Sequence, residues 1–155
     1  MAQLNSFNGG LAVDDRGSLR FCNSFNLSAL GIKRFYQVEN NMDLTIRAWH
    51  GHLKEDKYVY CPRGSAIVAG VPLSVDPDGK VDMSPQEPQR FVLSALKPMV
   101  LHIPAGYANG FRTLESDTIL MFFSTSTVEE SKGDDYRFAL DHAETARRAF
   151  QIEIR

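Results

Sequence analysis

The sequence predicts an all-β protein, a jelly-roll β-sandwich barrel that ends in one short helix. Eight short segments are rich in β-branched and aromatic residues, and Gly, Pro, Asn and Asp punctuate the chain between them. Only the alanine-containing segment at 141–150 has a helical pattern. The same signals allow an up-and-down barrel as the alternative architecture.

The predicted strands follow one another along the chain with short gaps. They cover residues 19–25, 33–38, 44–49, 58–61, 66–75, 90–95, 100–103 and 118–124. Residues 76–79 are Asp-Pro-Asp-Gly, a strong turn signal because proline presets φ and glycine supplies a positive φ. We expect an irregular loop at 82–88 and the helix at 141–150.

Length and composition favour a single domain that spans residues 1–155. The chain is 43% hydrophobic and 23% charged, with a net charge of −2, so it has no basic surface for nucleic acid. No apolar run reaches the roughly 18 residues of a membrane span. The N-terminus lacks the pattern of a signal peptide, so we expect a cytoplasmic protein. Cys22 and Cys61 are then expected to be free thiols.

The densest chemical signal is the segment at 47–52, Arg-Ala-Trp-His-Gly-His. Because side chains alternate along a strand, His50 and His52 point to the same face. Two imidazoles on one face inside a barrel suit either a metal site or a proton-transfer site. A pair of surface or hydrogen-bonded core histidines is the alternative.

The spacing that follows resembles the cupin pattern. In cupins His-x-His is followed by Glu after three or four residues, by Gly after six more, and later by Pro-x-Gly-x-x-His. Here Lys57 takes the Glu position, Gly64 is in place, and residues 104–109 supply the second half with Asn109 in the last position. An ammonium repels a divalent cation, and an amide is a poor ligand for zinc or iron. We therefore expect no metal and no other cofactor, with a fixed organic cation in the place of the metal.

A buried cation beside histidines suits enolate chemistry. Removing a proton next to a ketone moves negative charge onto the ketone oxygen, which a cation stabilises, while a neutral imidazole takes the proton. We predict His50 as the base, Lys57 as the oxyanion partner and His52 as a second catalytic imidazole. The alternative for Lys57 is an exposed strand lysine beside Glu55 and Asp56.

Across most of its length the chain resembles the dTDP-4-dehydrorhamnose 3,5-epimerase family of metal-free cupins. The resemblance rests on residues 14–19, on Gln37 with Asn40, on residues 47–50, on Lys57 and on residues 103–111. It implies that Arg16 binds the nucleotide diphosphate and that Arg47 contacts the substrate. It also implies a homodimer.

Three departures from that family concern the reaction. Asn109 replaces a histidine of the family, and the family's acid, a tyrosine thirteen residues further on, falls on Phe122. A phenylalanine cannot protonate a carbanion. His52 makes residues 47–52 similar to the Arg-Gly-x-His-x-His segment of the dTDP-sugar 3,4-ketoisomerases, and residues 34–36 are similar to that group as well.

Other polar residues are candidates for the substrate site. Tyr107 and Tyr136 are possible replacement acids, and Tyr36 either hydrogen-bonds the substrate or fills the barrel wall. Residues 134–137 follow a polar loop at 127–133 and either close over the site or form a charged turn. The complete set of candidate substrate-binding residues is Arg16, Gln37, Asn40, Arg47, Asn109, Tyr36 and Tyr136.

The sequence thus predicts an isomerase, either an epimerase or a 3,4-ketoisomerase. Its substrate would be a nucleotide-linked 4-keto-6-deoxyhexose used for surface polysaccharide, rearranged through an enolate or enediol. Because Phe122 offers no proton donor, we expect a reaction on one ring face, carried out by His50 with His52. The alternatives are a non-catalytic nucleotide-sugar-binding cupin and a metal-dependent cupin enzyme.

Overall fold

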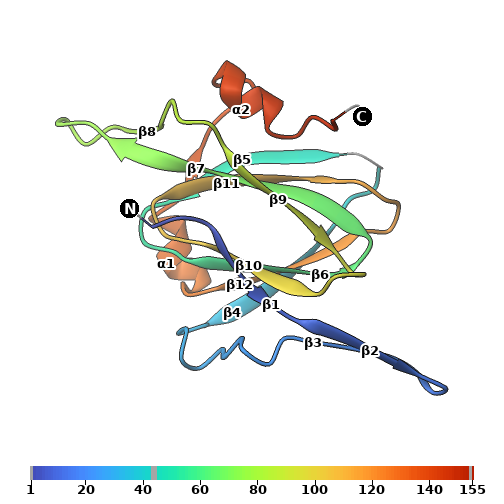
Figure 1. Ribbon diagram of the computed structural model, residues 1–155. Helices are drawn as coiled ribbons and strands as arrows, with labels where there is room; N and C mark the ends of the chain where they lie inside the picture. The colour runs from blue at the N-terminus through green and yellow to red at the C-terminus, as the bar shows by residue number, and fades with distance from the viewer. Residues whose placement is uncertain (1, 43–44, 154) are drawn as a thin grey trace.

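The computed structural model describes residues 2–42, 45–153 and 155, in which two antiparallel β-sheets face each other (Figure 1). The first sheet contains, in spatial order, β1 (Asn5–Asn8), β10 (Met99–Ile103), β6 (Lys57–Arg63), β12 (Ile119–Ser124) and β4 (Arg34–Glu39). The second contains β13 (Tyr136–Arg137), β5 (Ile46–His52), β11 (Tyr107–Thr113), β7 (Ser65–Val75) and β8 (Val81–Met83), and β9 (Gln89–Ser94) also pairs with β7. The predicted all-β, barrel-like class is confirmed.

The buried apolar side chains form two clusters. The first fills the space between the sheets and contains Leu4, Val59, Cys61, Ala66, Val68, Leu93, Leu101, Ile103, Tyr107, Phe111, Leu120 and Phe122. The second lies on the outer face of the six-stranded sheet, beneath α2 (Glu144–Arg148) (Figure 1). There the rings of Trp49 and Phe150 lie 5.0 Å apart, and both are almost completely buried. Burying a large apolar side chain contributes roughly 1.5–3 kcal/mol, so α2 is fixed to the sheet by its apolar contacts.

Alternation along the strands decides which side chains enter the interior. In β4 the side chains of Arg34, Tyr36 and Val38 are half-buried, whereas Phe35 and Gln37 are exposed on the outer face. Polar side chains from both layers line the remaining space between the sheets, next to Phe111 and Phe122 of the first cluster.

A two-stranded hairpin, β2 (Gly10–Asp14) with β3 (Gly17–Phe21), projects from the two sheets (Figure 1). The sequence predicted a strand at 19–25, but the first strand of the hairpin was not predicted. Leu11, Val13, Leu19 and Phe21 are all exposed on it. An isolated two-stranded ribbon is only marginally stable in water, so the hairpin offers apolar surface for a further contact.

The predicted boundaries hold within a few residues for most strands, and three local predictions need comment. Residues 127–133 are not a loop, because α1 (Val128–Lys132) begins there behind a capping box in which Thr127 and Glu130 hydrogen-bond each other. The predicted strand at 44–49 begins at Ile46, and Leu44 lies outside the described residues. The turn at 76–79 is confirmed, with Gly79 at φ +82°.

The C-terminal helix is present but shorter than the predicted 141–150, since α2 covers five residues and lacks a side-chain N-cap. Cys22 and Cys61 are both free. Within the described ranges, neither helix has the length and hydropathy needed to cross a membrane.

Candidate active site

A polar pocket opens between the two sheets. It consists of two adjoining cavities, of about 320 and 120 Å³, which share Tyr36, His50 and Lys57 in their walls. The larger cavity is also lined by Arg34, His52, Glu55, Val128, Ser131, Lys132, Asp135 and Arg137. The smaller is also lined by Val38, Arg47, Asn109, Phe111 and Phe122. The pocket therefore collects residues from β4, β5, β6, β11, β12, α1 and the segment around β13.

An irregularity in β5 turns two functional side chains into this pocket. The pairing of β11 with β5 shifts register, with Asn109 opposite His50 but Phe111 opposite Arg47. The step from Asn109 to Phe111 covers two residues of β11, whereas the matching step from His50 to Arg47 covers three residues of β5. In a regular strand Arg47 and His50 would face opposite sides, and the extra residue brings both to the pocket.

Lys57 lines both cavities of the pocket. Its side chain is buried, with the residue 5% exposed, and its Nζ donates to Asn109 Oδ1 at 3.3 Å. Burial lowers the pKa of Lys57 to about 8, although the charge of Glu55 acts in the opposite direction. At neutral pH the ammonium form still dominates, so the pocket contains a fixed positive charge beside two histidines.

The two imidazoles favour the neutral form for related reasons. Burial lowers the pKa of His50, and the charges of Arg137 and Lys57 lower it further. Burial also lowers the pKa of His52, again with Lys57 acting in the same direction and Glu55 opposing it. A neutral imidazole beside a cation is able to accept a proton, which is the state that a general base needs.

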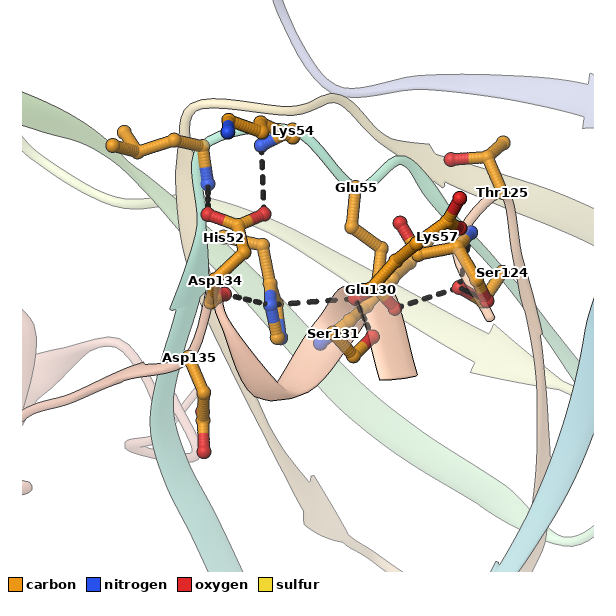
Figure 2. Close-up of polar contacts among 12 residues, drawn as sticks. His52, Lys54, Glu55, Lys57, Ser124, Thr125, Glu130, Ser131, Asp134 and Asp135 are labelled. Carbon is orange, nitrogen blue, oxygen red and sulfur yellow. Dashed lines mark hydrogen bonds and ion pairs between the residues drawn. The ribbon is translucent and has the colours of Figure 1, made fainter. Parts of the chain in front are cut away.

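His52 is held by an extensive polar network (Figure 2). Its Nδ1 lies 2.5 Å from the backbone oxygen of Asp134 and 3.3 Å from Glu55 Oε2. Glu55 is 2% exposed and is also hydrogen-bonded by Ser124 and Ser131. Among the described residues, the His50 ring has no comparable anchor and is perturbed only by burial and by nearby charges.

The wall opposite the histidines is aromatic. Tyr36 on β4 and Phe122 on β12 are cross-strand partners, and their rings stack 5.0 Å apart with an interplanar angle of 2°. Burial raises the pKa of the Tyr36 phenol, and the charge of Glu55 raises it further, so the hydroxyl stays protonated. Tyr36 is the phenol that lines both cavities.

The structure brings together Tyr36, Arg47, His50, His52, Lys57 and Asn109 from the predicted set. Asn40 lies beside this group, where its Oδ1 accepts a hydrogen bond from Arg47 Nε at 2.8 Å. Gln37 is on the outer face of β4 and donates to Glu39. Arg16 lies in the turn of the β2–β3 hairpin, paired with Asp14 and 86% exposed at its side chain.

The two tyrosines considered as replacement acids lie outside the pocket lining. Tyr107 packs in the apolar cluster between the sheets and donates its hydroxyl to the backbone oxygen of Ala2 at 2.7 Å. Tyr136 lies on β13, opposite Gly51, and its neighbours Asp135 and Arg137 line the pocket instead. Alternation along this short strand explains the difference.

Several polar residues that line the larger cavity were not among the predicted site residues, namely Arg34, Glu55, Ser131, Lys132, Asp135 and Arg137. Of the segment at 134–137, which was expected either to close over the site or to form a charged turn, Asp135 and Arg137 line the larger cavity. The signal for Glu55 was weak, because an acidic residue next to a lysine on a polar turn is usually solvated.

A metal site would need several donor side chains close together. Within residues 2–42, 45–153 and 155, no group of three or more His, Cys, Asp or Glu side chains is arranged to hold a metal ion. Lys57 and Asn109 stand where a cupin metal site would have a carboxylate and an imidazole.

Comparison with known proteins identifies the family to which the chain is similar. The family model described as dTDP-4-dehydrorhamnose 3,5-epimerase matches residues 6–144. The spore coat polysaccharide biosynthesis protein SpsL of Bacillus subtilis (strain 168) is 31% identical over 97 residues, which are 62% of this chain and 61% of SpsL. The match thus spans less than two thirds of that relative's length.

Solved structures share the fold at low sequence identity. The rmlC epimerase of Mycobacterium tuberculosis has a TM-score of 0.67 at 15% identity, over 86% of this chain and 68% of the other. ChmJ, a 3'-monoepimerase from Streptomyces bikiniensis solved with dTDP-quinovose, has 0.69 at 17% over the same shares. A 3,4-ketoisomerase from Helicobacter canadensis has 0.65 at 19%, over 96% and 98%. The cupin jelly roll is thereby confirmed.

Proposed function

The chain belongs to the dTDP-4-dehydrorhamnose 3,5-epimerase family, and from this premise we propose that it is an isomerase of a nucleotide-linked 4-keto-6-deoxyhexose. The observation that carries the proposal is the position of Lys57, a buried ammonium in the same pocket as the imidazoles of His50 and His52. This combination provides a base and an oxyanion partner within one cavity.

In the proposed reaction an imidazole removes the proton from the carbon next to the ketone. The C–H electrons form the carbon–carbon double bond, and the carbonyl electrons move to the oxygen, which faces the Lys57 ammonium. Returning a proton to carbon restores a ketone. If the proton returns to the same carbon from the opposite ring face, the centre is inverted. If the former carbonyl carbon takes the proton instead, its oxygen is protonated to a hydroxyl, the hydroxyl on the neighbouring carbon gives up its proton, and the ketone moves to that carbon.

Tyr36 is the proton donor that this scheme needs on the side opposite the histidines. Its phenol lines the pocket from the five-stranded sheet, whereas His50 and His52 line it from β5 in the other sheet. Burial keeps the hydroxyl protonated by raising its pKa. Tyr36 therefore offers the proton donor that Phe122 cannot provide, which supports inversion across the ring in place of the one-face reaction expected from the sequence.

A 3,4-ketoisomerase is the second candidate, and the position of His52 favours it. Both imidazoles line the larger cavity from one strand, so a proton can leave and return on the same ring face. One histidine would handle the carbon proton and the other the hydroxyl proton.

The charge of the pocket suits a diphosphate. Arg34, Arg47, Lys132 and Arg137 all contribute to its walls. Guanidinium groups are well matched to phosphate oxygens because they can donate two parallel hydrogen bonds. The family name and the dTDP-quinovose bound by ChmJ support dTDP as the nucleotide, and the name of SpsL supports a role in surface polysaccharide.

A homodimer is the assembly we propose, with the β2–β3 hairpin as its contact. The exposed Leu11, Val13, Leu19 and Phe21 would be covered by a second copy. Arg16 does not line the pocket of its own chain, so its proposed role on the diphosphate requires the hairpin to reach the pocket of the partner.

Proton NMR in deuterated water tests the function directly. Candidate dTDP-, GDP- and CDP-linked 4-keto-6-deoxyhexoses are incubated with the purified protein. Deuterium at C3 or C5 with an inverted centre identifies an epimerase, and a 3-keto product identifies a ketoisomerase. Binding without exchange on any of these sugars would refute the enzyme and favour a non-catalytic nucleotide-sugar-binding protein.

A further inference from the structure

Glu55 lies directly behind His52, at the edge of the pocket. We infer that Glu55 is a positioning residue, which selects the tautomer of His52 and ties this imidazole to helix α1. The inference deepens the proposed function and rests on it, since it assigns to His52 the nitrogen that accepts the substrate proton.

The first step is the set of contacts to Glu55 (Figure 2). Its side chain is fully buried, and four donors from four different elements surround its two oxygens. Oε1 accepts from Ser124 Oγ at 2.7 Å and lies 3.4 Å from Arg34 Nη2. Oε2 accepts from Ser131 Oγ and lies 3.3 Å from His52 Nδ1. A carboxylate has about four acceptor positions, so these contacts use all of them.

The second step is the tautomer of His52. Nδ1 faces two acceptors, the backbone oxygen of Asp134 at 2.5 Å and the Glu55 carboxylate. Neither a carbonyl oxygen nor a carboxylate surrounded by donors can supply a hydrogen, so Nδ1 must carry it. In the neutral ring Nε2 is then the nitrogen with a free lone pair. Since His52 lines the pocket, that lone pair is available to a substrate proton.

The other acceptor at His52 Nδ1, the backbone carbonyl of Asp134, is itself held in place. The Asp134 side chain is buried and accepts hydrogen bonds from the backbone nitrogens of Leu53 and Lys54, both at 2.8 Å. This arrangement joins the loop after β5 to the segment before β13. Glu55 and Asp134 therefore hold the ring from two directions, and Figure 2 shows both contacts on the same nitrogen.

The third step concerns α1, which forms one wall of the pocket through Val128, Ser131 and Lys132. None of its residues is buried, so apolar contacts do not hold it. It is held by polar contacts instead. Two of them lie next to His52: Ser131 donates to Glu55, and Arg34 Nη2 donates to Ser131 Oγ at 2.9 Å. Glu55 thus fixes both the orientation of the His52 ring and the position of α1.

The charges around His52 decide what the loss of Glu55 would do. Lys57 from β6 lowers the pKa of His52, whereas Glu55 and Asp134 raise it. His50 on the same strand and Asp135 and Arg137 near β13 also face this cavity. Without the Glu55 charge, the lowering of the His52 pKa by Lys57 is no longer offset by the carboxylate that lies beside Nδ1. We therefore expect a lower pKa for His52 in Glu55→Gln, together with a mixture of tautomers.

The first experiment needs no substrate. Two-bond ¹H–¹⁵N correlations of the histidine rings, recorded on the labelled wild-type protein above the pKa of His52, report which nitrogen is protonated. We expect the Nδ1–H form for His52. An Nε2–H form would overturn the inference, and because the measurement uses the wild type, it does not depend on the folding of any variant.

The second experiment compares Glu55→Gln with Lys33→Ala. Lys33 lies outside the pocket lining and pairs with Glu130 on α1 at 2.8 Å, so its loss loosens the helix without touching His52. We expect Glu55→Gln to lower kcat roughly ten- to hundred-fold and to move the acid limb of the rate profile to lower pH. Lys33→Ala should retain the acid limb of the wild-type rate profile and the wild-type tautomer of His52.

These outcomes separate the inference from the proposed function. If Glu55→Gln keeps the wild-type tautomer and titration of His52, or if Lys33→Ala reproduces its effects, Glu55 does not position His52. If the wild type shows the Nδ1–H form but rearranges no nucleotide sugar, the proposed function fails and the role of Glu55 in orienting His52 is retained.

Discussion

Tyr36 and Phe122 are direct cross-strand neighbours on β4 and β12, and their rings are parallel. Position 122 is where the resemblance to the epimerase family placed a tyrosine acid. The phenol that this chain has at the site is therefore one strand away, on the residue that stacks against Phe122. Opposite residues on neighbouring strands approach closely enough for one side chain to serve in place of the other.

The first prediction is that Tyr36→Phe slows turnover by about 10²–10⁴-fold, the usual contribution of general acid–base catalysis. Substrate affinity should change little, because the ring and its stacking on Phe122 remain. Rates measured by NMR in deuterated water check this, together with affinities from calorimetry. The double variant Tyr36→Phe with Phe122→Tyr is the matched test, and we expect it to regain part of the lost rate.

Wild-type turnover in Tyr36→Phe would contradict the assignment of this phenol as acid. In that case Tyr136→Phe becomes the decisive comparison, since Tyr136 lies on β13 beside two pocket residues. A large loss there, with none at position 36, would mean that β13 rearranges when substrate binds.

Much of this site follows from local patterns, and the remainder depends on pairing between distant segments. His50 and His52 face one pocket because strands alternate, and the cupin spacing identified Lys57 without the structure. The stacking of Tyr36 on Phe122 depends instead on the register of β4 with β12. No local pattern specifies that register.

The fold shows the same division. Eight strands were predicted close to their observed positions, whereas β2, β11 and α1 were missed, the last although Thr127 and Glu130 have the spacing of a capping box. A five-residue helix without a buried face leaves no periodicity to detect. Glu55 was missed for a related reason, since its partners Ser124 and Ser131 lie far along the chain.

The second prediction is a loss of activity as the pH rises through about 8. Burial lowers the pKa of Lys57 to about 8, so its ammonium loses the proton, and with it the oxyanion partner, in this range. The pH dependence of kcat/KM for the free enzyme measures it. Lys57→Arg keeps its charge at higher pH, and any activity that it retains should lack this limb. If Lys57→Arg shows the same loss of activity near pH 8, the titrating group is not Lys57.

The third prediction concerns metal. Lys57 and Asn109 stand at two of the positions that cupins use for ligands, so turnover should survive dialysis against a chelator. Elemental analysis of the purified protein, before and after dialysis, accompanies the assay. Near-stoichiometric zinc, iron or manganese, with activity lost on its removal and restored on its return, would establish a metal-dependent enzyme instead.

The fourth prediction concerns the hairpin. Arg16→Ala should weaken binding of a dTDP-sugar by roughly ten-fold while leaving the rate of the bound reaction unchanged, because a charge-assisted contact to phosphate is lost. Calorimetry measures the affinity and sedimentation the assembly. Val13→Asp, which introduces a charge on the exposed apolar face, should produce monomers and the same loss of affinity. Unchanged affinity in Arg16→Ala would mean that the diphosphate binds elsewhere.

The last prediction separates the two histidines. Both line the pocket, but only the His52 ring is anchored at Nδ1 among the described residues, and only His50 adjoins the smaller cavity with Arg47 and Asn109. In a 3,4-ketoisomerase both imidazoles move protons, so His50→Asn and His52→Asn should each lower turnover by about 10²–10⁴-fold. In an epimerase one histidine works with Tyr36, and a single histidine variant should show this loss. NMR of the product and of solvent deuterium in each variant distinguishes the cases.

One outcome would rule out the one-face reaction. The wild type would invert C3 and C5 together, and Tyr36→Phe and His50→Asn would abolish this reaction while His52→Asn would not. The anchored imidazole of His52 would then have only a supporting role.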